Sequence, residues 1–185
     1  MARTYPELPV LLVDDEAAVL AGEARVLAAA GVNNVLPCQD PRDAISLLAR
    51  GGADAVLLDI AMPHITGDRL LEQIRERWPD LPVIVVTASA DVEAAVRCIK
   101  AGAFDYMIKP VEPSRLASGV RRAAEMRALS RRYGALRERV LSENLEHPEA
   151  FAAIATVSRR MRAVLALADA LAATDETVPI TGETG

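Results

Sequence analysis

The sequence predicts an α/β protein with a doubly wound parallel sheet of five strand–helix units, (βα)5. Short apolar runs alternate with stretches of helical periodicity along the first two-thirds of the chain, which is the pattern of a parallel sheet with helices on both faces. The chain is 51% apolar but only 3% aromatic, so its 185 residues can bury a sizeable aliphatic core. The helix of the fifth unit is extended toward the C-terminus.

The expected strands are short, and most of them are apolar throughout, which is typical of strands buried on both faces. The second is poorer, because Pro37 cannot donate a hydrogen bond and favours a sheet edge. The strands are expected at 9–13, 34–38, 55–58, 82–87 and 104–108.

The expected helices follow the strands and have recognisable ends. Asp40 and Pro41 are a favoured cap and first residue for the second helix. Gly31 and Gly102 follow the first and fourth helices, where glycine commonly ends a helix. The helices are expected at 17–30, 41–50, 69–78 and 92–101, with the fifth beginning at Pro113.

The apolar run of the third strand ends abruptly in Asp59. A lone aspartate there could cap the next helix or could be a chemical group. Four of the five strand ends carry polar residues, and parallel strands present their carboxyl ends at one edge of the sheet. This convergence favours a chemical role. The converging residues are Asp14, Asp15, Asp59, Thr87 and Lys109.

These residue types suit a phosphoryl group carried by a carboxylate. Crowded carboxylates disfavour joint ionisation, and a divalent cation such as Mg²⁺ relieves that cost. Lys109 can pair with an anion and Thr87 can donate a hydrogen bond. Carboxylates are known phosphoryl acceptors, so the edge suits a phosphoryl group attached to one of its acids.

The same residues resemble the receiver domain of two-component response regulators in order and spacing. The resemblance rests on Asp14-Asp15, Asp59-Ile-Ala-Met-Pro63 with Gly67, Thr87-Ala88 and Lys109-Pro110. It implies a flavodoxin-like sheet of strand order 2-1-3-4-5 and phosphorylation of Asp59 by a sensor histidine kinase. It also implies that Mg²⁺ is held by Asp14, Asp15, Asp59 and the backbone carbonyl of Ala61, and that Thr87 and Lys109 contact the phosphoryl group.

The resemblance further implies a conformational switch. Thr87 moves toward phosphorylated Asp59, and Tyr106 turns inward into the space that Thr87 leaves. The output face would then comprise the helix at 92–101, the strand at 104–108 and the helix from Pro113. The Lys109–Pro110 peptide bond is expected to be cis.

The helix from Pro113 carries apolar residues beyond the length a receiver needs. They recur at alternating spacings of three and four, which is typical of a two-stranded coiled coil. We expect a parallel homodimer; a helix that folds back on its own domain is the alternative. Many arginines flank this seam and are expected to be solvated. The seam residues are Met126, Leu129, Tyr133, Leu136 and Val140.

The C-terminal part resembles the opening of the AAA+ ATPase domain of NtrC-type activators of sigma-54 RNA polymerase. Ser158 precedes a helix, a short strand is expected at 178–180, and Gly182 to Gly185 match only the first half of a phosphate-binding loop. The expected domains are a receiver at 1–122, a helical linker at 123–147 and a truncated ATPase fragment at 148–185. Contacts with polymerase and DNA are expected in the full-length protein and not through this chain.

Other classes of protein are less consistent with the sequence. No apolar run is long enough to span a bilayer, and two cysteines form no disulfide framework, so a cytoplasmic protein without a membrane contact is expected. A phosphohydrolase with Asp59 as nucleophile is an alternative, but Ala61 stands where its proton donor is expected. A stand-alone receiver that acts by protein contact, or a nucleotide-binding flavodoxin-like protein, are the others. The favoured interpretation is a signalling domain and not an enzyme.

Overall fold

The structure is a computed structural model that describes residues 4–63, 65–88, 92–142 and 147–172, without the side chains of 135–142 and 170. The chain divides into two compact units, Met1–Leu129 and Ser130–Gly185. The first contains the predicted sheet, and one long helix continues across the division.

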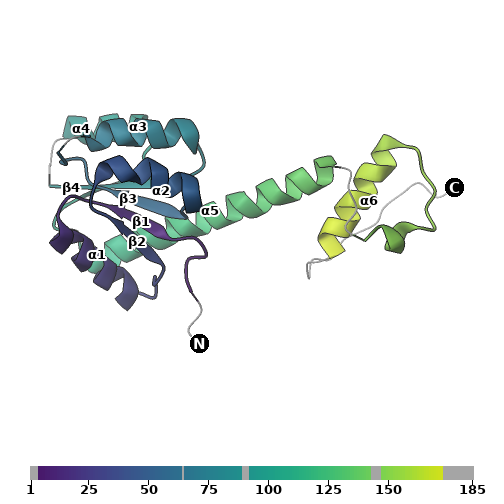
Figure 1. The fold of residues 1–185 in the computed structure, drawn as a ribbon, viewed down its shortest axis with the longest axis horizontal. Helices are drawn as coiled ribbons and strands as arrows, with labels where there is room; N and C mark the ends of the chain where they lie inside the picture. The colour runs from purple at the N-terminus through teal and green to yellow at the C-terminus, as the bar shows by residue number, and fades with distance from the viewer. Residues whose placement is uncertain (1–3, 64, 89–91, 143–146, 173–185) are drawn as a thin grey trace. The chain divides into compact units, whose positions relative to one another are not determined.

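The first unit is built on a five-stranded sheet of order β2-β1-β3-β4-β5, and every neighbouring pair is parallel (Figure 1). This confirms the predicted fold class and strand order. As expected, the strand that contains Pro37 lies at an edge of the sheet. The strands are β1 (Val10–Val13), β2 (Val35–Cys38), β3 (Ala55–Leu58), β4 (Val83–Thr87) and β5 (Asp105–Ile108).

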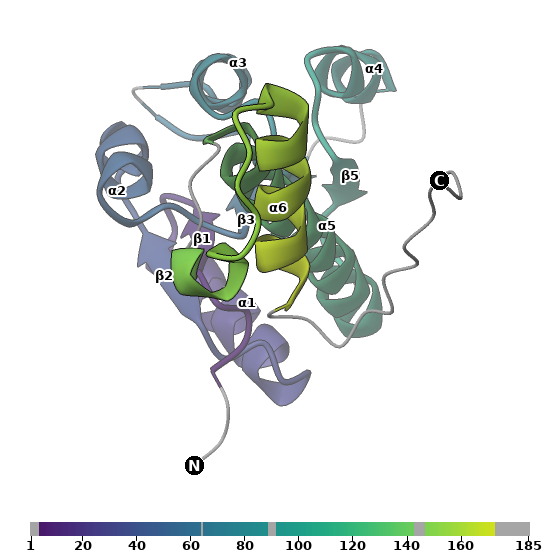
Figure 2. The same cartoon turned by 90° about the vertical axis from the view of Figure 1, so that its right-hand side faces the viewer.

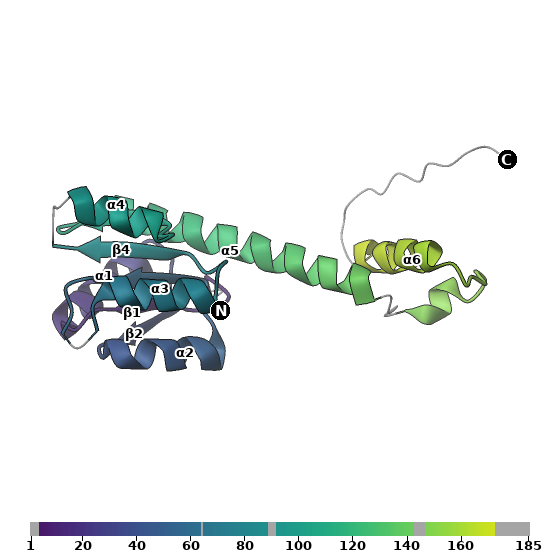
Figure 3. The same ribbon diagram turned by 90° about the horizontal axis from the view of Figure 1, so that it is seen from above.

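Helices cover both faces of this sheet, and the strands and helices run along roughly the same direction (Figures 2 and 3). One face packs against α1 (Ala17–Ala29) and the first part of α5 (Pro113–Ser142). The other packs against α2 (Ala44–Gly51), α3 (Gly67–Arg77) and α4 (Val92–Lys100).

Alternation along the strands divides the core into two clusters. In β1, Val10 and Leu12 pack toward α1 and α5, whereas Leu11 and Val13 pack toward α2, α3 and α4. All four are at most 1% exposed. Both faces of the strand must therefore be apolar, which explains the unbroken apolar runs of the sequence.

The helix α5 begins as the last element of the first unit. Leu116, Val120 and Ala123 are buried against the sheet, as their spacing predicts. Gly119 lies so close to β5 that a Cβ there would come within 2.5 Å of the Cε atom of Met107. The α5 helix therefore sits closely on β5, and a side chain at this position would require the end of the Met107 side chain to move.

A few element boundaries differ from prediction. A 3-10 turn (Pro41–Asp43) precedes α2, and Asp40 caps it by accepting a hydrogen bond from the backbone of Arg42 at 3.0 Å. The long helix extends to Ser142 at the edge of the described residues, so the predicted stretch from there toward His147 lies outside them. His147 itself precedes a short 3-10 helix (Pro148–Phe151).

The second unit contains that 3-10 helix and α6 (Arg159–Ala172). Ser158 precedes α6 as predicted, and its Oγ accepts a hydrogen bond from the backbone N–H of Met161 at 3.4 Å. The Nδ1 atom of His147 lies 3.0 Å from the Oδ1 atom of buried Asp169. The predicted strand at 178–180 and the loop at 182–185 lie outside the described residues. None of the described helices combines the length and the apolar composition of a transmembrane span.

Candidate functional site

The polar residues at the carboxyl ends of the strands meet at one edge of the sheet. Asp14 follows β1, Asp59 follows β3, Thr87 ends β4 and Lys109 follows β5. Backbone hydrogen bonds connect neighbouring ends: the N–H of Asp59 donates to the carbonyl of Val13 at 3.0 Å, and that of Lys109 donates to the carbonyl of Thr87 at 2.8 Å. Because β1 and β4 both flank β3, Asp59 lies at the centre of the group.

Lys109 joins the two buried acids at this edge. Its Nζ atom lies 2.6 Å from Oδ2 of Asp14 and 2.8 Å from Oδ2 of Asp59. The side chains of the acids are only 3% and 9% exposed, and that of the lysine is 23% exposed. Burial lowers the pKa of Lys109, but the hydrogen bonds and charges of both carboxylates outweigh it and raise the pKa overall. The lysine is therefore a firmly held cation.

The second oxygen of each acid is held by a nearby backbone N–H group. Oδ1 of Asp14 accepts from the N–H of Glu16 at 2.8 Å, and Oδ1 of Asp59 accepts from the N–H of Ala61 at 3.0 Å. Each acid is thus oriented by its own turn on one side and by Lys109 on the other. The Oδ2 atoms share one cation.

The loop after β3 approaches Asp59 so closely that it requires a glycine. A Cβ on Gly67 would lie 2.3 Å from the carbonyl oxygen of Asp59 and 2.6 Å from the Cα atom of Ile60. The backbone N–H of Gly67 also donates to the carbonyl of Ile60 at 3.2 Å. This explains the glycine of the sequence motif: the helix α3 starts against the backbone of the candidate phosphoacceptor.

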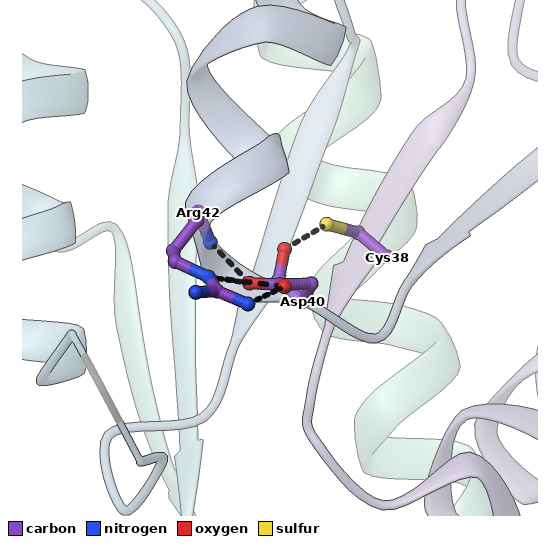
Figure 4. A network of polar contacts seen from close by, with 3 residues as sticks. All are labelled: Cys38, Asp40 and Arg42. Carbon is purple, nitrogen blue, oxygen red and sulfur yellow. Dashed lines mark hydrogen bonds and ion pairs between the residues drawn. The ribbon is translucent and has the colours of Figure 1, made fainter.

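Asp15 and a shallow cavity lie beside the acids. The side-chain amide of Gln39 donates to the backbone carbonyl of Asp15 at 3.1 Å, and Asp15 is partly exposed. A cavity of about 420 Å³ adjoins it, lined by Asp15, Gln39, Asp40, Pro41, Arg42 and Pro63. Two of the lining residues pair with each other: the guanidinium of Arg42 donates to both carboxylate oxygens of Asp40. The thiol of Cys38 also donates to the backbone carbonyl of Asp40 (Figure 4).

The charge balance of the edge suits a divalent cation. Asp14 and Asp59 are buried with Lys109 between them, and Asp15 adds a third carboxylate. Three carboxylates and one ammonium leave an excess of negative charge, and oxygen donors of this kind match Mg²⁺. Among the described residues, however, no three acidic, histidine or cysteine side chains already stand as a metal cluster. The carboxylate donors fit the metal chemically. In this structure Asp14 and Asp59 are held together by Lys109.

The two predicted switch residues occupy different positions relative to this edge. Thr87 is 1% exposed at the end of β4. Tyr106 is paired with Val85 in the middle of β5 and is partly buried against the cluster that includes α2, α3 and α4. Both therefore belong to adjacent strands, with Thr87 nearer the acids in the chain direction.

Glu23 is a residue of this region that the sequence analysis missed. Burial raises the pKa of this α1 carboxyl to about 7; the charge of Lys109 lowers it, and those of Asp14 and Asp59 raise it. Its electrostatic coupling to three site residues places it near the acidic edge. Helical periodicity alone gives no signal for this, because a glutamate in a helix is ordinarily solvated.

The predicted dimer seam is exposed where its side chains are described. Met126, Leu129 and Tyr133 are 46%, 69% and 70% exposed on α5. Leu136 and Val140 lie in the helical backbone, but their side chains are outside the described part. The described part of the stripe is thus an exposed apolar surface.

The chain is similar to known signalling proteins over most of its length. The family described as response regulator receiver domain matches residues 10–121. The alginate biosynthesis transcriptional regulatory protein AlgB of Pseudomonas aeruginosa is 34% identical over 176 residues, which cover 95% of this chain and 37% of that protein. The DNA-binding transcriptional regulator NtrC of Escherichia coli is 39% identical over 114 residues, covering 62% and 24%.

A solved structure of a further regulator is also similar to this chain. NtrX from Brucella abortus in complex with ADP matches with a TM-score of 0.63 and 31% identity, covering 71% of this chain and 29% of that one. The chain therefore spans well under half of the length of these regulators. The matched region contains the whole sheet and the Asp14–Asp59–Lys109 cluster, and the chain belongs to the response regulator receiver family, with NtrC-type regulators of transcription among its relatives.

Proposed function

We propose that this chain is the phosphoacceptor part of an NtrC-type response regulator and that Asp59 accepts a phosphoryl group from a sensor histidine kinase. The single observation that carries the proposal is the bridge from Nζ of Lys109 to Asp14 and Asp59, at 2.6 and 2.8 Å. It holds a cation directly against the carboxylate that would receive a phosphoryl group. A purely structural aspartate at a strand end would need no such partner.

The proposed reaction is a displacement at phosphorus. A carboxylate oxygen of Asp59 attacks the phosphohistidine of the kinase, the P–N bond breaks with its electron pair leaving on the imidazole, and an aspartyl phosphate forms. Lys109 stabilises the charge on the phosphoryl oxygens as they approach, and Thr87 donates a hydrogen bond to one of them. Hydrolysis of the aspartyl phosphate by water later restores the carboxylate.

Asp14, Asp15, Asp59 and the backbone carbonyl of Ala61 are the groups that would hold Mg²⁺. When bound, the metal neutralises negative charge on the phosphoryl oxygens. The support is the excess of carboxylates over cations at this edge. In the same proposal, the negative charges of Asp14 and Asp15 let the site bind a cation before the phosphoryl group arrives.

We further propose that the new charge at Asp59 draws Thr87 inward and lets Tyr106 turn, shifting the population of two packings of α4, β5 and the start of α5. The position of Tyr106 on the strand next to Thr87 supports this. The conformational change would be transmitted along α5 through a linker at 123–147 to an ATPase domain, of which 148–185 is the N-terminal fragment. In the whole protein that ATPase would act on sigma-54 RNA polymerase at DNA, and the α5 seam would make a parallel homodimer.

Intact-mass spectrometry after incubation with acetyl phosphate tests the phosphoacceptor. We expect the chain to gain one phosphoryl group only when Mg²⁺ is present, and Asp59→Asn to gain none. A matched control is Asp43→Asn, an exposed aspartate near the same edge that should leave the uptake unchanged. A folded wild-type chain that gains no phosphate under these conditions would refute the proposal, as would undiminished uptake by Asp59→Asn.

A further inference from the structure

One face of α5 carries two different surfaces in succession. Near the sheet it is basic, and further along the helix it becomes apolar. Spacings of three and four residues place all of these positions on the same side of a helix. In chain order the face comprises Arg115, Ser118, Arg122, Met126, Leu129 and Tyr133, all exposed.

The basic part is tied to the edge strand β5 by one carboxylate. Nη2 of Arg122 lies 3.4 Å from Oδ2 of Asp105, and Nη2 of Arg115 lies 3.7 Å from its Oδ1. The same Nη2 of Arg115 donates to the carbonyl of Tyr106 at 3.4 Å. A cavity of about 940 Å³ opens here, lined by Phe104, Asp105, Arg115, Ser118 and Arg122. Asp105, at 23% exposed, is the least solvated of the three charged side chains.

The coiled-coil repeat places Arg122 at the base of the proposed seam. Arg122 precedes Leu129 by one heptad, so it occupies the same d position of the repeat. Gly119 precedes Met126 by one heptad, but it faces Met107 of β5 and cannot belong to a seam with another helix. The seam therefore starts at Arg122, and no apolar layer lies below it.

A second copy of the chain is the occupant that this geometry fits. In a parallel pair the same d position meets on both helices, so two Arg122 guanidinium groups face each other across the first layer. Like charges at that distance oppose association. Asp105 lies beside Arg122 on the receiver side and supplies a negative charge to its guanidinium group. The partner helix has the same sequence and presents a second arginine at this layer instead.

We propose that Asp105 is a positioning residue that draws Arg122 out of the α5 seam and so permits two copies of this chain to pair. The inference rests on the proposed homodimer. Because Asp105 immediately precedes Tyr106 in β5, a change in the packing of this strand alters the hold on Arg122. The stability of the dimer thereby becomes sensitive to the state of the receiver.

The test is sedimentation of the whole chain across a concentration series at low salt, for wild type and substitutions at the two positions. We expect Asp105→Asn to weaken dimerisation by about tenfold, because Arg122 loses its partner. Arg122→Met should strengthen it by about tenfold or more, because the first layer becomes apolar. In the Arg122→Met background, Asp105→Asn should change nothing.

Controls separate this inference from the seam itself. Arg121→Met removes the neighbouring arginine, which donates to the carbonyl of Ala30 and lies off the seam, and it should leave the dimer unchanged. A wild-type chain that stays monomeric at every concentration would overturn the seam and this inference together. A wild-type dimer that Arg122→Met does not strengthen, or an Asp105→Asn effect that persists without Arg122, would overturn the inference and leave the seam standing. Phosphoryl uptake, measured on the same samples, reports on Asp59 independently.

Discussion

Replacing Lys109 by Met is the change that most directly tests the physical role of the acidic edge. Methionine is close to lysine in length but carries no charge, so the change removes the cation and keeps most of the packing. Asp14 and Asp59 would then face each other with no positive charge between their Oδ2 atoms. The backbone N–H groups that hold the Oδ1 atoms would remain.

The magnitude follows from the burial of the two acids. Removing one partner of a buried ion pair costs about 3–5 kcal/mol, because a buried charge is left without compensation. Here two carboxylates, 3% and 9% exposed, lose the same cation. The lysine is itself 23% exposed, so water reaches part of the site and the lower end applies. We expect the free energy of unfolding to fall by about 3 kcal/mol at neutral pH without metal.

Urea denaturation with and without Mg²⁺ measures this effect. A divalent cation should restore more stability to Lys109→Met than it adds to wild type, because it replaces the lost positive charge. Phosphoryl uptake should remain severely impaired, since the metal does not supply the ammonium. Lys100→Met, at an exposed lysine of α4, is the matched control and should be nearly neutral. A loss below about 1 kcal/mol in Lys109→Met would refute the view that Lys109 holds the two acids together.

Two other changes test the surroundings of the site. Gly67→Ala should lose about 2 kcal/mol of unfolding free energy and slow phosphoryl uptake, because its Cβ would meet the backbone of Asp59 at 2.3 Å. Gly22→Ala, with no atom within 4 Å of the added carbon, should instead gain up to about 1 kcal/mol; equal effects at both glycines would contradict the close approach. For Glu23, the folded-state pKa of about 7 exceeds its ordinary value of 4.5, so the folded protein holds the proton more tightly. The contribution of Glu23 to the unfolding free energy should therefore be fully present below pH 4.5 and be lost as the pH rises to 7, by up to about 3 kcal/mol, in urea titrations without metal. Glu23→Gln should flatten that slope, and an unchanged slope would show that Glu23 is not the group responsible.

Much of the fold follows from local patterns of the sequence. Unbroken apolar runs such as Val10–Val13 require strands buried on both faces, and alternation with helices requires them to be parallel. The boundaries were less predictable. For example, the turn at Pro41–Asp43 precedes the α-helix proper. Helix ends depend on whether solvent or neighbouring groups satisfy the terminal backbone atoms, which a propensity pattern does not record.

The acidic edge was predictable because chain order places it. Each parallel strand ends on the same side of the sheet, so Asp14, Asp59, Thr87 and Lys109 had to converge once the strands were recognised. Their spacing also matches the receiver family, which the comparison with known proteins confirms for residues 10–121. Their roles in phosphoryl transfer stay predictions.

Chain order and periodicity did not predict which side chains of different helices and strands contact each other. The sequence places Glu23 in a helix and Asp105 in a strand, and both look like ordinary surface charges. Packing of α1 beside the strand ends raises the pKa of Glu23, and packing of α5 on β5 brings Arg122 to Asp105. The periodicity of a chain specifies which face of an element is apolar, because burial repeats with the turn of the helix or the pleat of the strand. Which charges meet depends on how two elements far apart in sequence are aligned, and this is settled by close packing of the assembled core.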